Sequence, residues 1–269
     1  MVSTKIAAVL GGGAVFLAVV GYGMSVLFSG IMPDFATLED QGVTIYDNGN
    51  KYVKGFKSFF IDGSFDGNQK WWDWSYNNRW LKDNSDSLKQ KAKSKFQGVT
   101  GGYKDKDGNE TNSLRKKCKD AYDATSSDVE DSAKEDSKFE TKDIWRYCSI
   151  GGVKPVLASG YDTARFGGKE EWKGKLVSVK NEDKESNDWF WEIREREFRY
   201  GVKIKSQLNS EPRGISSEEG KAFRDLYKKT KSGTVKGLCK EIYEELESSR
   251  DAKKIDEKDI KKFCFLIPE

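Results

Sequence analysis

Four cysteines are the residues of this chain whose type and spacing could do chemistry. Cys118 and Cys148 lie in the first half of the sequence, and Cys239 and Cys264 lie in the second half. Four cysteines allow three disulfide connectivities. Because free cysteine is among the most buried residue types, buried thiols are the alternative to disulfide bonds. A zinc site would need further ligands, and the chain has neither a CxxC pair nor a histidine.

The absence of histidine also restricts catalysis. It removes histidine as a general acid or base, and it removes the Ser-His and Cys-His arrangements that activate a nucleophile. Carboxylates are the remaining candidates, and none of the 44 acidic residues lies in a recognisable apolar setting that would shift its pKa. We therefore predict no catalytic residue, no cofactor and no metal site, and keep a carboxylate-based hydrolase as the last alternative.

The charge of the chain argues against nucleic acid as a partner. Among 269 residues, 47 are basic and 44 are acidic, which gives a net charge of +3. Proteins that bind nucleic acid carry a marked basic excess, so we predict no nucleic-acid partner. Fifteen Phe, eleven Tyr and eight Trp indicate folded domains, because disordered segments are poor in aromatic residues.

The cysteines belong to phrases that occur twice. "KDIWRYCSI" at 142–150 returns as "KDIKKFCFL" at 258–266, and "LRKKCKDAYD" at 114–123 returns as "VKGLCKEIYE" at 235–244. "WDWSYNNRWL" at 72–81 matches "WFWEIREREF" at 189–198, which pairs Arg79 with Arg196. Since the matches keep the same order, they predict a duplicated domain.

The repeated phrases have helical spacing. Val235, Cys239, Ile242 and Tyr243 follow i, i+4, i+7 and i+8, which is typical of one apolar stripe on a helix. We predict a mainly α fold with about four helices in each copy. Copy one spans residues 43–150, a linker spans 151–157, and copy two spans 158–269. Residues 98–112 and 126–140 are predicted surface loops. Because each copy should carry its own bridge, the duplication favours Cys118–Cys148 and Cys239–Cys264.

The N-terminal segment has no charged residue from Ile6 to Pro33. This length covers the roughly 20 residues that a bilayer requires. We predict a transmembrane anchor at 1–32, followed by a juxtamembrane linker at 33–42; a cleaved signal peptide is the alternative. Lys5 before the segment predicts a single-pass protein whose C-terminal domain is extracellular. The alternative localisation is secreted.

Residues that differ between the copies are candidates for a partner-facing surface. Copy two has acidic residues where copy one has Trp71 and Trp80, and lysines where copy one has Trp145 and Arg146. We predict that these four residues face a partner. Trp74 and Trp191 match between the copies at helical spacing, and we predict that they lie in the core.

Three phrases occur together behind an apolar N-terminal segment: "LRKKCKDAY", "KDIWRYCSIGGVKPV" and the W-x-W…R helix. They resemble the large paralogous families of hypothetical proteins of hemotropic mycoplasmas, which live on the surface of red cells. The resemblance covers residues 5–158 best. Copy two departs from it at Lys261 and Phe265, which replace Trp145 and Ser149. The resemblance implies surface exposure, host contact or antigenic variation, and it carries over no catalytic residue.

Location and composition lead to one functional hypothesis and one alternative. We predict a membrane-anchored surface protein with a duplicated helical ectodomain, non-enzymatic, that binds a host-cell surface protein or varies antigenically. The alternative is a secreted structural or immune-decoy protein without a dedicated ligand.

Overall fold

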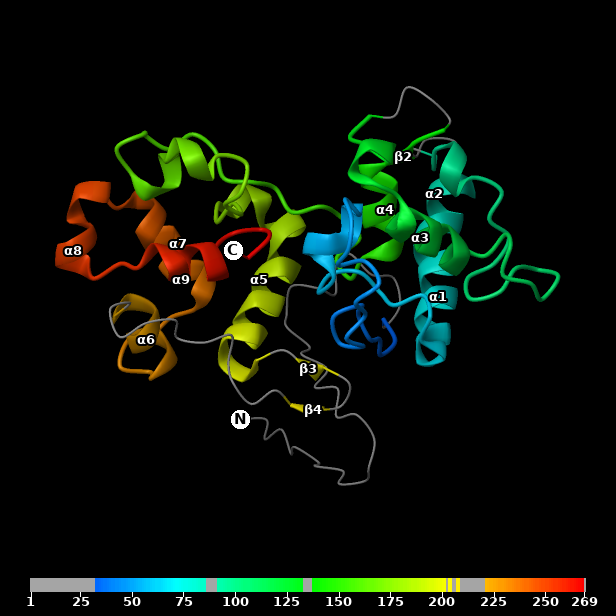
Figure 1. The fold of residues 1–269 in the computed structure, drawn as a ribbon, viewed down its shortest axis with the longest axis horizontal. Coiled ribbons are helices and arrows are strands. Elements are labelled where there is room, and N and C mark those ends of the chain that lie inside the picture. The colour runs from blue at the N-terminus through cyan, green and yellow to red at the C-terminus, as the bar shows by residue number, and fades with distance from the viewer. Residues whose placement is uncertain are drawn as a thin grey trace, which may run out of the picture.

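The computed structural model describes residues 32–85, 91–132, 137–201, 203–204, 207–208 and 221–268. Within this part of the chain the protein is mainly helical, and its strands are two residues long. Helices α1 to α4 lie on one side of the molecule and helices α6 to α9 on the other, with α5 between them (Figure 1). The predicted mainly helical fold is confirmed.

The helices and strands of the first half follow the predicted phrases closely. They are α1 (Gln69–Ser75), a π-helical turn (Tyr76–Trp80), α2 (Leu81–Ser85), α3 (Leu114–Asp123), β1 (Val129–Glu130), β2 (Phe139–Glu140) and α4 (Thr141–Cys148). β1 and β2 form a short parallel pair inside the predicted loop 126–140. A 3₁₀ turn, Tyr52–Phe56, precedes these elements.

The second half contains the longest helix among the described residues. Its elements are α5 (Lys184–Tyr200), the antiparallel pair β3 (Lys203–Ile204) and β4 (Gln207–Leu208), α6 (Lys221–Tyr227), α7 (Val235–Glu244), α8 (Arg250–Lys253) and α9 (Glu257–Phe263). Helices α3 and α7 begin alike: the Ser113 side chain accepts a hydrogen bond from the Lys116 amide, and the Thr234 side chain accepts one from the Gly237 amide. Such N-caps satisfy backbone donors that a helix leaves unpaired.

Both predicted disulfides are present. Cys118–Cys148 joins α3 to α4, and Cys239–Cys264 joins α7 to the end of α9. All four cysteines are fully buried. Beside each bridge a buried tyrosine hydroxyl donates to the carbonyl of the second cysteine: Tyr122 to Cys148 at 3.2 Å, and the hydroxyl of α7 residue Tyr243 to Cys264 at 3.2 Å. Burial raises the pKa of both tyrosines, so they remain neutral donors.

Other contacts recur in the two halves at corresponding places. The Asn68 side chain accepts from the Ala36 amide at 2.7 Å and donates to the Ala36 carbonyl at 2.8 Å. Asn187 does the same with Val156, at 2.7 Å and 2.9 Å. Isolated β-bridges also come in three pairs: Thr37–Ile61 with Leu157–Val177, Lys51–Thr125 with Arg165–Leu246, and Phe60–Ser149 with Leu176–Phe265.

The two halves share a continuous apolar core. The Phe59 ring meets the Trp189 ring edge-on, with centroids 5.5 Å apart, and Trp145 lies 6.1 Å from Trp189. Gly151 allows this close packing, because a Cβ there would lie 2.1 Å from the Trp189 ring. The halves are therefore packed against each other through aromatic side chains rather than through a polar surface.

The predicted membrane anchor is corrected. Across the described ranges, no helix is long and apolar enough to span a bilayer. The longest, α5, has 17 residues and carries buried Arg194 and Glu197, whereas a spanning helix needs roughly 20 apolar residues. This finding overturns the transmembrane part of the predicted fold class and the predicted single-pass localisation. Residues 1–31 of the predicted anchor lie outside the described residues.

Candidate functional site

Trp71, which was predicted to face a partner, is fully buried. Its ring lies edge-on to Trp72 at 4.9 Å, and the guanidinium of Arg79 lies 5.5 Å from its centroid. The prediction was wrong because it compared Trp71 with an acidic residue of the second half and treated sequence difference as exposure. The matching contacts of Asn68 and Asn187 place Trp71 in register with Phe190, which is also fully buried, so the match with an acidic residue was out of register.

Trp80 is half-buried and belongs to the π-helical turn. Its ring stacks on Tyr76 with centroids 5.5 Å apart, and its indole N–H donates to the Phe96 carbonyl at 2.8 Å. The indole therefore fastens the helix to the segment that follows it. Glu197, the residue matched with Trp80 in sequence, is itself buried and pairs with Arg194 at 2.7 Å.

Trp145 is also fully buried, so its predicted exposure is wrong. The ring packs against Phe60 at 4.9 Å and lies 6.1 Å from Trp189, and its indole N–H donates to the Tyr52 hydroxyl at 2.8 Å. The periodicity of α4 identified the face that its own half buries. It could not show that the second half covers the neighbouring face as well.

Arg146 remains partly exposed and forms a two-pronged ion pair. Its Nε and Nη2 donate to the two carboxylate oxygens of Asp83, at 2.7 Å and 3.0 Å. This geometry joins α4 to α2, and paired Arg–carboxylate hydrogen bonds are among the stronger polar contacts in proteins. Trp74 and Trp191, predicted to lie in the core, are both buried.

Close to Trp145, an open groove lies where the first half meets the C-terminal end of the second. Its volume is about 720 Å³. Gly55 and Ile267 mark the point where the halves meet, because a Cβ at Gly55 would lie 2.7 Å from the Ile267 side chain. The groove is lined by Lys51, Tyr52, Lys54, Gly55, Phe56, Ser126, Val129, Asp131, Thr141, Lys154, Ile267 and Pro268. We call it the junction groove.

The junction groove combines apolar and basic side chains. Tyr52 and Phe56 come from the 3₁₀ turn, with their rings 5.5 Å apart. Burial raises the pKa of Tyr52 to about 12, although the hydrogen bond from Trp145 acts in the opposite direction, so its hydroxyl is neutral. Trp145 therefore lies one layer beneath the groove and holds Tyr52 in its wall. Lysines supply three of the groove's charges, and Asp131 supplies the opposing one.

Two buried carboxyl groups near α4, those of Asp143 and Glu140, bear on the hydrolase alternative. Asp143 is 4 % exposed, and its Oδ2 accepts from the Lys93 amide at 2.7 Å. Burial, together with the nearby Glu140, raises its pKa to about 6, although the hydrogen bond from the Lys93 amide acts in the opposite direction. Neither Asp143 nor Glu140 is among the residues that line the junction groove. Asp143 ties the start of α4 to the backbone of Lys93, and Glu140 pairs with Lys142 at 2.8 Å.

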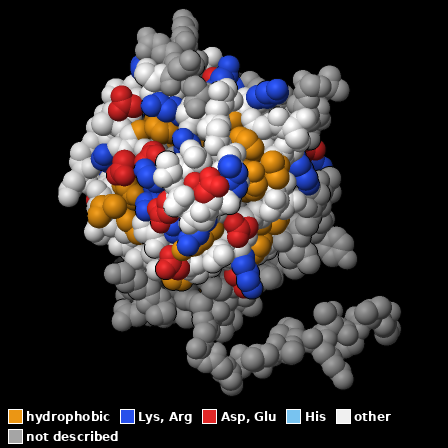
Figure 2. Space-filling view, turned by 90° about the vertical axis from the view of Figure 1, so that its right-hand side faces the viewer, with side chains coloured by type: hydrophobic (Ala, Val, Ile, Leu, Met, Phe, Trp, Pro, Cys, Tyr) orange, Lys and Arg blue, Asp and Glu red, His pale blue; other side chains and the backbone are white. Residues whose placement is uncertain are grey.

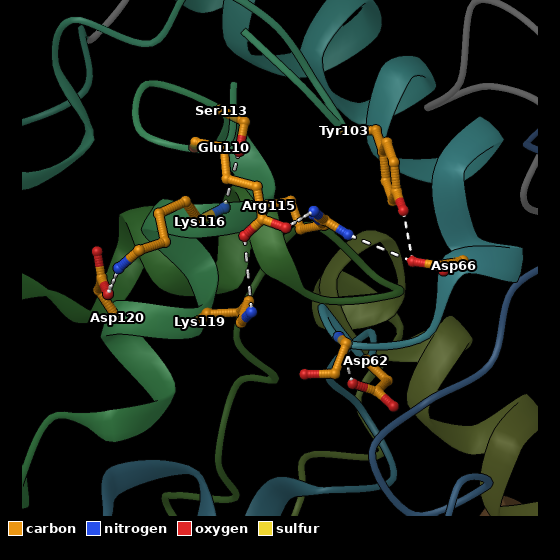
Figure 3. Close-up of polar contacts among 10 residues, drawn as sticks. Asp62, Asp66, Tyr103, Glu110, Ser113, Arg115, Lys116, Lys119 and Asp120 are labelled. Carbon is orange, nitrogen blue, oxygen red and sulfur yellow. Dashed lines mark hydrogen bonds and ion pairs between the residues drawn. The ribbon is translucent and has the colours of Figure 1, made fainter. Parts of the chain in front are cut away.

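A second polar cluster surrounds Arg115 on α3 (Figure 3). Arg115 pairs with Glu110 and, at 3.7 Å, with Asp66, while its guanidinium lies 3.8 Å from the centroid of the Tyr103 ring. Tyr103 in turn donates to Asp66. These contacts fix the predicted loop 98–112 to α3 and to the start of α1. The cluster is internally paired, so we assign it a structural role.

The same loop contains the turn that begins at Asp105. The Asp105 carboxylate accepts from the amides of Asp107 at 3.0 Å, Asn109 at 2.8 Å and Asn112 at 3.3 Å. Although desolvation acts in the opposite direction, these backbone hydrogen bonds lower the pKa of Asp105. The carboxylate therefore shapes its own loop.

On this side of the molecule, the surface is not dominated by charges of one sign. Figure 2, which views the right-hand side of Figure 1, shows lysine and arginine interspersed with aspartate and glutamate, with apolar side chains between them. This pattern matches the near balance of charges in the chain.

Comparison of the chain with protein-family models, with curated proteins and with solved structures finds no match in any of the three. Because no relative suggests a function, the proposed function is based on the junction groove. The sequence signal that could have found it is weak: Lys51, Tyr52, Lys54 and Phe56 lie together in "KYVKGF".

Proposed function

We propose that this chain is a non-enzymatic binding protein built from two copies of one disulfide-bonded helical unit, and that the junction groove is its binding site. Copy one is residues 43–150 and copy two is residues 158–269, and the short segment before each copy, with Ala36 and Val156, takes part in the matching contacts. The recurring disulfides, capped helices, asparagine contacts and β-bridges support the duplication. Matching contacts at so many corresponding places are what one fold used twice would produce.

The junction groove is the observation that carries the binding function. At about 720 Å³ it has the volume typical of ligand sites, and it combines aromatic walls with a few charged groups. Its position between the two copies explains why a duplicated chain would have one such groove. Copy one contributes Tyr52 and Phe56, and copy two contributes Ile267.

The class of partner follows from the resemblance and from the disulfides. Disulfides persist in oxidising surroundings, such as the outside of a cell. The resemblance to families of hemotropic mycoplasmas implies contact with a host cell. We therefore propose that the partner is a protein of the host red-cell surface. A decoy without a dedicated ligand would have no use for the groove.

Site-specific photocrosslinking tests this function. A benzoylphenylalanine replaces Lys54 in the groove, and in a matched control it replaces Lys173, whose side chain is 77 % exposed in copy two. Each protein is irradiated on washed red-cell membranes. We expect one saturable crosslinked species from position 54 and none from position 173. Equal labelling from both positions, or none from either, contradicts the proposed function and favours the decoy alternative.

A further inference from the structure

The place in copy two that corresponds to the junction groove is closed by a buried lysine. Lys169 is 8 % exposed and lies 4.7 Å from the centroid of the Trp172 ring. Its Nζ pairs with Glu247 at 2.7 Å, Glu257 at 2.9 Å and Glu171 at 3.0 Å. Although desolvation opposes the charge, these hydrogen bonds raise the pKa of Lys169. The charge of Lys169 is thus paired with carboxylates of copy two itself.

Backbone contacts establish the correspondence between the two places. The Tyr52 amide donates to the Ala124 carbonyl at 3.1 Å, as the Phe166 amide donates to the Glu245 carbonyl at 3.0 Å. Two positions further along, Ser126 takes the place of Glu247.

The backbone hydrogen bonds of Ser126 and Glu247 also have similar lengths. The Ser126 amide donates to the Asn50 carbonyl at 2.8 Å, and the Glu247 amide donates to the Ala164 carbonyl at 2.9 Å. At the helix starts, Thr141 is the first residue of α4 and Glu257 is the first residue of α9. Copy one therefore has hydroxyl side chains at the two positions where copy two has glutamates.

The lysines of the junction groove lack these internal carboxylates. Lys54 is exposed and has no ion-pair partner in the described part of the chain. Lys154 lies 3.8 Å from Asp131, which is 87 % exposed, and such surface pairs contribute little. Lys51 donates to the Asp123 carbonyl. The groove therefore keeps a basic rim around an apolar wall, with room where copy two places its glutamates.

From this difference between the copies we infer that the junction groove binds an acidic peptide segment of the partner. Its carboxylates occupy the place that Glu247 and Glu257 hold in copy two, and an apolar side chain between them packs on Tyr52, Phe56 and Ile267. Charge complementarity selects the peptide, because Asp131 is the one acidic side chain among the groove-lining residues. This inference rests on the proposed binding function and specifies its ligand.

Peptide titration of the whole chain tests the inference. The probe is the fluorescein-labelled peptide Glu-Glu-Leu-Glu-Glu, blocked at both ends, and its control is Gln-Gln-Leu-Gln-Gln. We expect saturable binding of the acidic peptide, weakened at least tenfold between low and high salt, and no binding of the control peptide. Equal binding of both peptides, or of neither, overturns the inference. Binding that inorganic phosphate abolishes at equal concentration also overturns it, since the groove would then select a small anion.

Two variants at one exposed position locate the binding. Ser126→Glu supplies the carboxylate that copy two has at this place, and Ser126→Gln adds a neutral side chain of similar size. We expect at least tenfold weaker peptide binding for S126E than for S126Q. If both variants bind equally well, the peptide occupies another surface and the inference fails.

The photocrosslink separates this inference from the proposed function. A partner captured at position 54 without acidic-peptide binding, and with capture that salt does not reduce, retains the binding function and rejects the acidic ligand. The absence of capture at position 54 rejects the binding function itself.

Discussion

Arg79 and Arg194 make the same contact in the two halves of the molecule. Arg79 donates through Nη1 to the Ser149 carbonyl at 2.6 Å, and Arg194 donates through Nη2 to the Phe265 carbonyl at 3.2 Å. Both side chains are fully buried. Burial lowers the pKa of Arg79 to about 9, which still leaves the guanidinium charged at neutral pH. Each arginine thus binds the backbone carbonyl of the residue that follows the second cysteine of its disulfide.

This relationship corrects the predicted alignment, which paired Arg79 with Arg196. Arg196 is exposed. The repeated phrase has arginines at both 194 and 196, and the tryptophan spacing selected the second. The spacing from tryptophan to arginine differs between the halves, and the helix types differ as well: Tyr76–Trp80 forms a π-helical turn, whereas α5 is a regular helix.

Replacing either buried arginine should destabilise the protein strongly. In Arg79→Leu and Arg194→Leu, buried carbonyl groups lose their donor, at a cost of about 1–3 kcal/mol for each unsatisfied group. Arg196→Leu is the matched control and should change stability by less than about 0.5 kcal/mol. Urea unfolding measures the three differences. A loss for R196L equal to that for R194L would restore the sequence alignment.

Removing either disulfide should cost about 3–4 kcal/mol, because the bridges close loops with sequence separations of 30 and 25 residues. The variants are Cys118→Ala/Cys148→Ala and Cys239→Ala/Cys264→Ala, compared by urea unfolding without reductant. Mass mapping of the unreduced protein should give these two pairs alone. A stability change below about 1 kcal/mol in both double variants, or a peptide that joins the two copies, would contradict the assignment.

The raised pKa of Asp143 predicts that the stability of the protein depends on pH. Its pKa is about 6 in the folded protein and 3.8 in its ordinary state, so between these values the folded chain holds a proton that the unfolded chain releases. The free energy of unfolding therefore falls as pH rises through this window, and the cost is fully present above pH 6. Asp143→Asn removes the cost and keeps an oxygen to accept from the Lys93 amide.

We expect D143N to be more stable than the native chain at pH 7.5, by up to about 3 kcal/mol. The difference should vanish below pH 3.8. Asp107→Asn, at an exposed loop position, is the control and should change stability little at either pH. A D143N variant that is less stable at pH 7.5 would show that the Asp143 carboxylate is favoured in the folded state.

Trp145→Phe isolates the hydrogen bond beneath the groove. Phenylalanine keeps much of the aromatic packing and removes the indole N–H that donates to the Tyr52 hydroxyl. We expect a loss of about 1–2 kcal/mol in stability and weaker acidic-peptide binding, because Tyr52 is then held less firmly. Trp80→Phe, which removes a comparable indole hydrogen bond to Phe96 away from the groove, should leave peptide binding unchanged.

Helical periodicity and the cysteine phrases predicted much of the fold. The stripe of Val235, Cys239, Ile242 and Tyr243 is buried as expected, and the favoured disulfide pairing is confirmed. These features depend on residues close together in sequence or on a motif that occurs twice.

The burial of the predicted partner-facing residues, and the position of the groove, could not be predicted in this way. Trp145 is buried because Phe56 and Phe60 of its own half and Trp189 of the second half pack around it, and no periodicity within α4 contains that information. The junction groove depends on the approach of Ile267 to Gly55, which is still more distant along the chain. Long-range packing between the halves therefore decided what is buried and what is open.

The number of ligands bound per chain tests the proposed function most directly, since the proposed binding site is the one junction groove whereas the proposed helical unit occurs twice. Isothermal titration calorimetry of the whole chain with the Glu-Glu-Leu-Glu-Glu peptide should give one site in the native protein, and at least tenfold weaker binding at that site in Ser126→Glu. Two equivalent sites would show that Lys169 and its glutamates do not close copy two, and no site in the native protein would show that the junction groove does not bind acidic chains.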